Sequence, residues 1–187
     1  MRPEEQLRAI VEESIVSKAG SSVILVGPHG CGKTHHISSV ISEYPDLPVV
    51  HFPGALASPA LCPDPQGTLL ALLPDSTGVS SFEDYFSNNP GTLLLVMEDL
   101  DLFGGGISEQ AFLYSLFDLT LSHPLVILAT TCRQVRTIAY MFRISWSFSK
   151  RGSRVGLAII SFPYQCRRLK STRNASSSWG WKKMRRR

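Results

Sequence analysis

The sequence lacks acidic residues beyond Asp118. Residues 1–149 hold 7 Lys/Arg and 15 Asp/Glu, whereas residues 150–187 hold 12 Lys/Arg and no Asp or Glu. An acidic body followed by a basic segment is typical of proteins whose basic part contacts nucleic acid. It is equally typical of a chain whose final segment does not belong to the folded domain.

Cysteine and long apolar runs are also scarce. The four cysteines form no C-x-x-C pair, which argues against a zinc site or a disulfide framework. The apolar runs Leu93–Met97 and Leu125–Ala129 have the length of strands, well short of the roughly 18 residues of a membrane span. The first residues are charged and contain no signal core. We therefore expect reduced intracellular thiols, no membrane contact and a single α/β domain.

The clearest motif is a glycine-rich turn between an apolar strand and a helical pattern. Residues 27–34 fit G-x-x-x-x-G-K-[ST], the phosphate-binding loop of nucleotide-binding proteins. Glycines let the backbone N–H groups point inward around an anion, and the lysine reaches the β- and γ-phosphates. The threonine hydroxyl is suited to Mg²⁺. The motif predicts nucleotide and Mg²⁺ binding by Gly27, Pro28, His29, Gly30, Cys31, Gly32, Lys33 and Thr34, with Thr34 also a metal ligand.

A second motif follows the apolar run 92–97, where Glu98 and Asp99 stand side by side. In a phosphate-loop protein, one such carboxylate holds Mg²⁺ through water and the next orients or deprotonates the attacking water. We assign Glu98 to the metal and Asp99 to catalysis. Paired acids at a strand end can also be no more than a solvated terminus.

Apolar periodicity and turn residues predict strands that alternate with helices. This alternation predicts a parallel sheet with helices on both faces, and a ligand at the carboxyl ends of the strands. We expect adjacent His35 and His36 to be surface or capping residues, because neighbours on a helix cannot share a metal. We expect helices over 3–19, 33–42, 81–88 and 108–120, strands over 22–26, 48–52, 92–97 and 125–129, a loop with one short helical piece over 53–74, and a turn over 104–106. We expect the first of these helices to pack on the domain through one apolar face, formed by Leu7, Ile10, Val11, Ile15 and Val16.

Three further segments narrow the family: Asp101-Leu-Phe103, Leu113-Tyr-Ser-Leu-Phe-Asp118 and Thr131-Cys-Arg133. In these three segments the chain resembles the subunit 4 family of the eukaryotic origin recognition complex, which belongs to the AAA+ ATPases. The resemblance covers roughly residues 5–135. The resemblance implies a nuclear protein that binds ATP between neighbouring subunits of a ring-like assembly on double-stranded origin DNA. It also implies that the phosphate loop of residues 27–34 holds the nucleotide.

Two positions depart from the family pattern. Glu98 and Asp99 stand where the family usually has Asp and then Glu. The Asp99 side chain is one methylene shorter than the usual Glu, so its carboxylate reaches roughly 1.5 Å less far. We therefore expect nucleotide binding to persist and hydrolysis to be weak or absent. Thr130 or Thr131 occupies the region where the family has a polar sensor residue at the end of the fourth strand, and we assign the sensor role to neither.

Beyond Gln134 the family pattern ends. The family's interface arginine segment, helical lid and winged-helix domain have no counterpart here, so we expect them to be absent and assign no interface role to Arg143, Arg151 or Arg154. We expect a nucleotide-binding domain over residues 1–134 and a basic tail over 135–187. The tail is interpreted as aberrant coding sequence, as a disordered tail, or as a basic arm with tryptophans that stack on nucleic acid.

Two functions stay open. The first is an ATP-binding subunit of an origin-binding complex, in which nucleotide joins subunits and hydrolysis is minor. The second is another AAA+ ATPase, similar to the clamp loaders, with its own hydrolytic activity. The inverted acids and the missing arginine segment favour the first.

Overall fold

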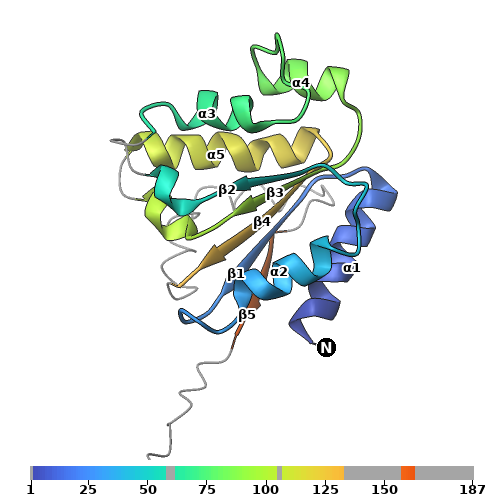
Figure 1. Ribbon diagram of the computed structural model, residues 1–187, viewed down its shortest axis with the longest axis vertical. Coiled ribbons are helices and arrows are strands. Elements are labelled where there is room, and N and C mark those ends of the chain that lie inside the picture. The colour runs from blue at the N-terminus through green and yellow to red at the C-terminus, as the bar shows by residue number, and fades with distance from the viewer. Residues whose placement is uncertain (1, 58–61, 105–106, 133–156, 163–187) are drawn as a thin grey trace, which may run out of the picture.

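The computed structural model describes residues 2–57, 62–104, 107–132 and 157–162 (Figure 1). Within these residues, helices and strands alternate along the chain as the sequence predicts. The elements are α1 (Pro3–Ser17), β1 (Ser21–Val26), α2 (Lys33–Ile41), β2 (Val49–Phe52), η1 (Gly54–Ala57), α3 (Pro65–Leu72), α4 (Phe82–Asn88), β3 (Leu93–Met97), η2 (Leu100–Gly104), α5 (Ile107–Ser122), β4 (Leu125–Thr131) and β5 (Leu157–Ser161).

The strands of the described part form one parallel sheet in the order β2-β3-β4-β1-β5. Strand β1 pairs with β4 on one side and with β5 on the other, so that Val23 lies opposite both Leu128 and Ala158. The predicted α/β class and parallel sheet are confirmed.

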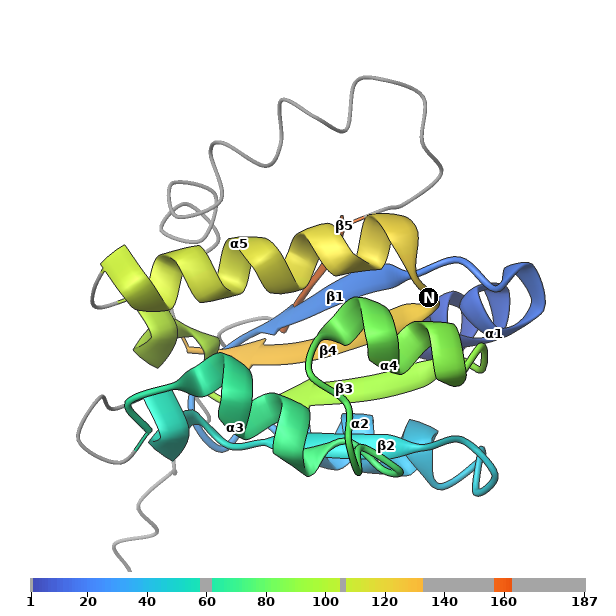
Figure 2. The same cartoon turned by 90° about the horizontal axis from the view of Figure 1, so that it is seen from above.

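Helices cover both faces of the sheet (Figures 1 and 2). Side chains alternate along each strand, so neighbouring residues belong to different cores: Ile24 packs with α3, α4 and α5, whereas Val23 and Leu25 pack with α1 and α2. Both faces of the strands are apolar, as expected for a parallel sheet buried on both sides. Each fully buried Leu, Ile or Val contributes about 1.5–3 kcal/mol.

Helix α1 confirms the predicted start and corrects the predicted apolar face. Pro3 is its first residue, and it ends before Lys18, whose φ of 49° is left-handed. The buried positions are Leu7, Val11 and Ser14, whereas Val16 is 86% exposed. Val16 was wrongly placed on the core because it lies two residues beyond Ser14, which turns it about 200° away around the helix.

The middle of the chain agrees with the sequence prediction in outline. Ser81 caps α4 by accepting a hydrogen bond from the Asp84 N–H at 3.2 Å. The short helical piece expected before residue 74 is α3, capped by Asp64. Part of the predicted 104–106 turn, residues 105 and 106, lies outside the described residues. No helix among the described segments is both long and apolar enough to span a bilayer.

The strand β5 was not predicted. Its residues, Leu157–Ser161, lie in the segment that we interpret as a basic tail, yet they pair in register with Ser22–Val26. Residues 133–156 and 163–187 lie outside the described residues, so the proposed boundary at residue 134 stays a prediction there. The sheet itself includes residues from both sides of that boundary.

Gly20 gives a test of the packing between the α1–β1 connection and the end of α5. A Cβ at Gly20 would lie 2.3 Å from the backbone oxygen of Thr120 and 2.5 Å from that of His123. Because both atoms belong to the backbone, we expect Gly20→Ala to destabilise the fold by about 1–3 kcal/mol. Chemical denaturation measures the free energy of unfolding.

Gly91→Ala is the matched control, because a Cβ there would meet nothing within 4 Å. We expect its effect to stay within about 0.5 kcal/mol. Equal stabilities for the two variants would show that α5 can move away from Gly20 at no cost.

Candidate functional site

The segment between β1 and α2 forms a tight loop over residues 27–32. Gly30 and Gly32 have φ of 74° and 94°, in the left-handed region where residues with a Cβ are disfavoured. A Cβ at Gly30 would meet nothing within 4 Å, so this part of the loop opens outward. The strand, loop and helix therefore have the arrangement that the phosphate-loop motif requires.

Lys33 is turned into this loop. Its Nζ donates to the backbone oxygens of Gly27 at 2.8 Å and Pro28 at 3.0 Å, and the residue is only 8% exposed. A buried ammonium without partners would be costly, and these carbonyls meet that need. The positive charge therefore lies at the centre of the loop.

The remaining loop residues lie nearer the surface. His29 and Thr34 are exposed, and Pro28 and Cys31 are half-buried. The Cys31 Sγ lies 3.9 Å from the Lys33 Nζ. Thr34 follows Lys33 in the first turn of α2, where a hydroxyl can reach a metal bound to phosphate. All eight predicted loop residues are thus brought together, and their binding roles stay predictions.

Glu98 and Asp99 form a turn directly after β3. Both are half-buried, and Asp99 has a φ of 49°, which is uncommon for a residue other than glycine. The Asp99 N–H donates to the Thr130 Oγ1 at 3.2 Å, and the Glu98 N–H donates to the Phe52 carbonyl at 3.3 Å. A Cβ on Gly54 would come within 2.8 Å of the Asp99 Cβ. The turn is therefore held from β2, β4 and η1.

Asp101 is a member of this site that the sequence motifs left without a role. Its Oδ1 accepts a hydrogen bond from the Thr131 hydroxyl at 3.0 Å, and its Oδ2 accepts from the Cys132 Sγ at 3.5 Å. Burial alone would raise the pKa of Asp101, but these hydrogen bonds outweigh it and lower that pKa. Burial, and then the adjacent Asp101 carboxylate, raise the pKa of the Cys132 thiol. The sequence marked Asp101 only by its position after Asp99 and by its place in the segment 101–103, and neither signal indicated its hydrogen bonds to β4.

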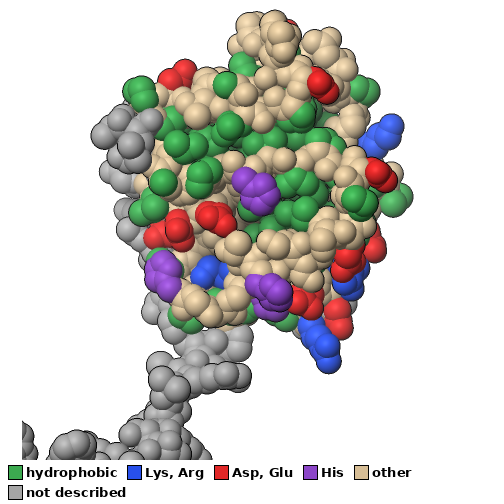
Figure 3. All heavy atoms as spheres, in the orientation of Figure 1, with side chains coloured by type: hydrophobic (Ala, Val, Ile, Leu, Met, Phe, Trp, Pro, Cys, Tyr) green, Lys and Arg blue, Asp and Glu red, His purple; other side chains and the backbone are tan. Residues whose placement is uncertain are grey.

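The strand order places these groups together. Strands β3, β4 and β1 are neighbours and parallel, so the acid turn, Thr130 and Thr131, and the loop all leave the same edge of the sheet. Figure 3 shows acidic, basic and histidine side chains close together at this end of the molecule. Over the described ranges, no three His, Cys, Asp or Glu residues are grouped as a metal site. The donor set suits Mg²⁺, which takes most of its ligands from water and phosphate.

His36 corrects a prediction. We expected a surface or capping histidine, but its Nδ1 lies 2.6 Å from the Glu4 Oε1 and its ring stacks on Phe162 at 5.1 Å between centroids. His35, by contrast, is exposed as expected. The His36 contacts come from α1 and from the residue after β5, so no local pattern in the sequence could indicate them.

The fold is similar to that of proteins solved with DNA. A chain of the Drosophila ORC bound to poly(dA/dT) DNA and Cdc6 matches with a TM-score of 0.60 at 13% identity, over 86% of this chain and 28% of that one. The Aeropyrum pernix ORC1 protein in complex with DNA matches with a TM-score of 0.51 at 14% identity, over 86% of this chain and 44% of that one. No protein-family model and no curated protein matches the sequence.

These likenesses define the class of fold. The chain has a parallel α/β fold that is similar to the fold of the matched parts of these ORC and ORC1 chains. It spans less than half the length of those chains.

The lowered pKa of Asp101 gives a prediction for the dependence of stability on pH. A carboxyl group whose pKa is lower in the folded state than in the unfolded state stabilises the folded state at pH values above its unfolded pKa, which for aspartate is the ordinary 3.8. This stabilisation is lost as the pH falls through the lower pKa of the folded state. We expect Asp101→Asn to be less stable than the natural chain at pH 7, and the difference to shrink below about pH 4. Urea titrations at both pH values measure it.

Asp118→Asn, which replaces an exposed aspartate on α5, controls for the loss of one negative charge. A stability difference for Asp101→Asn that is the same at pH 7 and at pH 3 would show that the ionised carboxylate is not what Thr131 and Cys132 stabilise.

Proposed function

We propose that this chain is an ATP-binding AAA+ subunit of an origin recognition complex, of the subunit 4 kind. The observation that carries the proposal is the buried Lys33 ammonium at the centre of a loop with two left-handed glycines, beside an acid turn on the same edge of the sheet. A loop of this shape suits a triphosphate. The likeness to ORC and Orc1 structures supports the choice among AAA+ proteins.

In this proposal each residue of the site has a role. Gly27 and Pro28 form the start of the loop, and the backbone N–H groups of His29, Gly30 and Gly32, with the Lys33 ammonium, hold the β- and γ-phosphates of ATP. Thr34 and Glu98 hold Mg²⁺, which neutralises charge on those phosphates, Glu98 acting through water. Asp99 orients the attacking water. Because its carboxylate is one methylene shorter than glutamate and its backbone is fixed by Thr130, we propose slow hydrolysis or none.

The proposed location and partners of the chain follow from its proposed place in an origin recognition complex. We propose that the subunit acts in the nucleus with other subunits of the complex, on double-stranded origin DNA, at the start of replication. The solved ORC and Orc1 chains in complexes with DNA support this setting. Nucleotide would then join neighbouring subunits, and turnover would be of minor importance.

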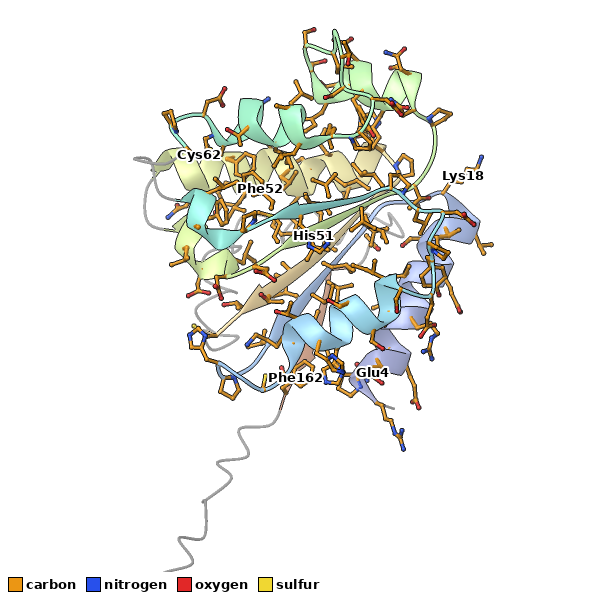
Figure 4. The ribbon with its side chains drawn as sticks, viewed as in Figure 1. Glu4, Lys18, His51, Phe52, Cys62 and Phe162 are labelled. Carbon is orange, nitrogen blue, oxygen red and sulfur yellow. The ribbon has the colours of Figure 1, made fainter. Side chains whose placement is uncertain are left out.

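Lys33→Ala tests the proposal directly. Removal of the ammonium takes away charge-assisted hydrogen bonds to phosphate, so we expect the affinity for Mg-ATP to fall at least about tenfold. Isothermal titration calorimetry on the full chain measures this affinity. Lys18→Ala, which removes an exposed lysine on the opposite side of the molecule (Figure 4), should leave the affinity unchanged.

The same variants test the setting. Co-expression with the other complex subunits should recover the natural chain and Lys18→Ala in the assembly, and less of Lys33→Ala. A natural chain that folds and gives no binding heat and no thermal stabilisation with Mg-ATP would overturn the proposal.

The alternative function is an independent ATPase similar to the clamp loaders, favoured by the complete acid turn beside the loop. Asp99→Asn separates the two, because asparagine keeps the side-chain shape and tolerates the left-handed backbone. We expect ATP affinity to stay within about twofold and the already slow phosphate release to change little. Fast steady-state hydrolysis that Asp99→Asn abolishes would favour the alternative.

A further inference from the structure

Phe162, the residue after β5, is tied to the last residue before the phosphate loop. Its N–H donates to the carbonyl of Val26 at 2.7 Å, while the next residue, Gly27, donates its N–H to Thr131 of β4 at 3.2 Å. The start of the loop is therefore held from both neighbouring strands. One of those strands comes from the segment that the sequence analysis places outside the domain.

The side chain of Phe162 also packs against the start of the loop. Phe162 is 8% exposed, and a Cβ added to Gly27 would lie 2.8 Å from the Phe162 Cβ and 2.8 Å from the Cys31 Sγ. These two side chains therefore leave no room for a side chain at Gly27. Gly27 is required here for close packing, since its carbonyl must also reach the Lys33 Nζ.

The same ring contacts the helix that follows the loop. It stacks on His36 with an interplanar angle of 26°. The His36 N–H donates to the carbonyl of Gly32, the last loop residue, at 3.0 Å, and its imidazole pairs with Glu4 of α1. Figure 4 shows Phe162 and Glu4 close together beside α2. Phe162 therefore supports both ends of the loop at once.

We propose that Phe162 is a positioning residue for the phosphate loop: its ring, stacked on His36 and packed under Gly27, fixes the separation between the end of β1 and the start of α2. This inference rests on the proposed ATP binding. The N–H groups of the loop converge on a phosphate only at the correct separation, and misplacements of about 1 Å weaken such sites strongly. Residues 157–162 are accordingly part of the nucleotide site.

Phe162→Leu tests the inference, because leucine stays apolar and removes the ring that stacks on His36. We expect the affinity of the full chain for Mg-ATP to fall about three- to tenfold, the range of an aromatic pair. Calorimetry is done well below the melting temperature of each variant, so that all the protein is folded. Phe162→Tyr keeps the ring and should restore the affinity of the natural chain.

Phe86→Leu is a matched control. Phe86 is 5% exposed and stacks on a histidine too, His123, at 4.7 Å and 10°. This pair lies by the amino ends of β3 and β4, at the opposite edge of the sheet from the loop. We expect Phe86→Leu to lower the melting temperature and to leave ATP affinity within twofold of the natural chain. A purely structural role of Phe162 predicts the same outcome for both leucine variants.

The outcomes separate the inference from the proposed function. A natural chain that binds no ATP overturns the proposed function. A natural chain that binds ATP, with Phe162→Leu binding equally well, overturns the inference alone. If Phe162→Leu does not fold, His36→Ala and His36→Phe replace it. The alanine removes the stack and should weaken binding, the phenylalanine keeps the stack and should not, and equal affinities overturn the inference.

Discussion

Strand β1 is hydrogen-bonded on both of its edges up to its last residue, and the candidate site depends on this constraint. The carbonyl of Val26 accepts from Phe162 on one side, and the N–H of Gly27 donates to Thr131 on the other. A glycine-rich loop is soft, and by itself it does not define where its N–H groups point. The sheet fixes the position of one end of the loop and α2 that of the other. The Lys33 ammonium then holds the loop by donating hydrogen bonds to the carbonyls of Gly27 and Pro28. The geometry of the candidate site therefore depends on strand pairing.

Most of the fold was predictable because its signals are local. The strands β1, β3 and β4 each contain an uninterrupted apolar run of four or five residues, and the caps Ser81 and Asp64 stand directly before their helices. The phosphate loop was predictable for the same reason, since its glycines, lysine and threonine lie within eight residues. A motif of this kind carries its own geometry, and only its roles in binding need experiment.

The features that the sequence analysis missed are non-local. Strand β5 has five residues, and the sequence around it has only weak helical or strand periodicity, so its place is indicated only by its pairing with β1. His36 resembles a surface histidine until Glu4 and Phe162 are brought to it from both ends of the chain. Asp101 resembles another solvated acid until β4 presents Thr131 and Cys132. Val16 was misplaced for a simpler reason, because an apolar residue at the margin of an amphipathic stripe can face water at small cost.

The register of β1 has a consequence for synthesis of the chain. Its partners lie about a hundred residues downstream in β4 and further still in β5, so the sheet is built from contacts distant in sequence, which fold slowly. During synthesis, the edge of β1 that pairs with β5 has no partner while the 25 residues between Thr131 and Leu157 are made. At ordinary elongation rates this takes on the order of one to five seconds. During that interval the N–H and C=O groups on this edge of β1 are unpaired, and they are open to pairing with any other extended segment.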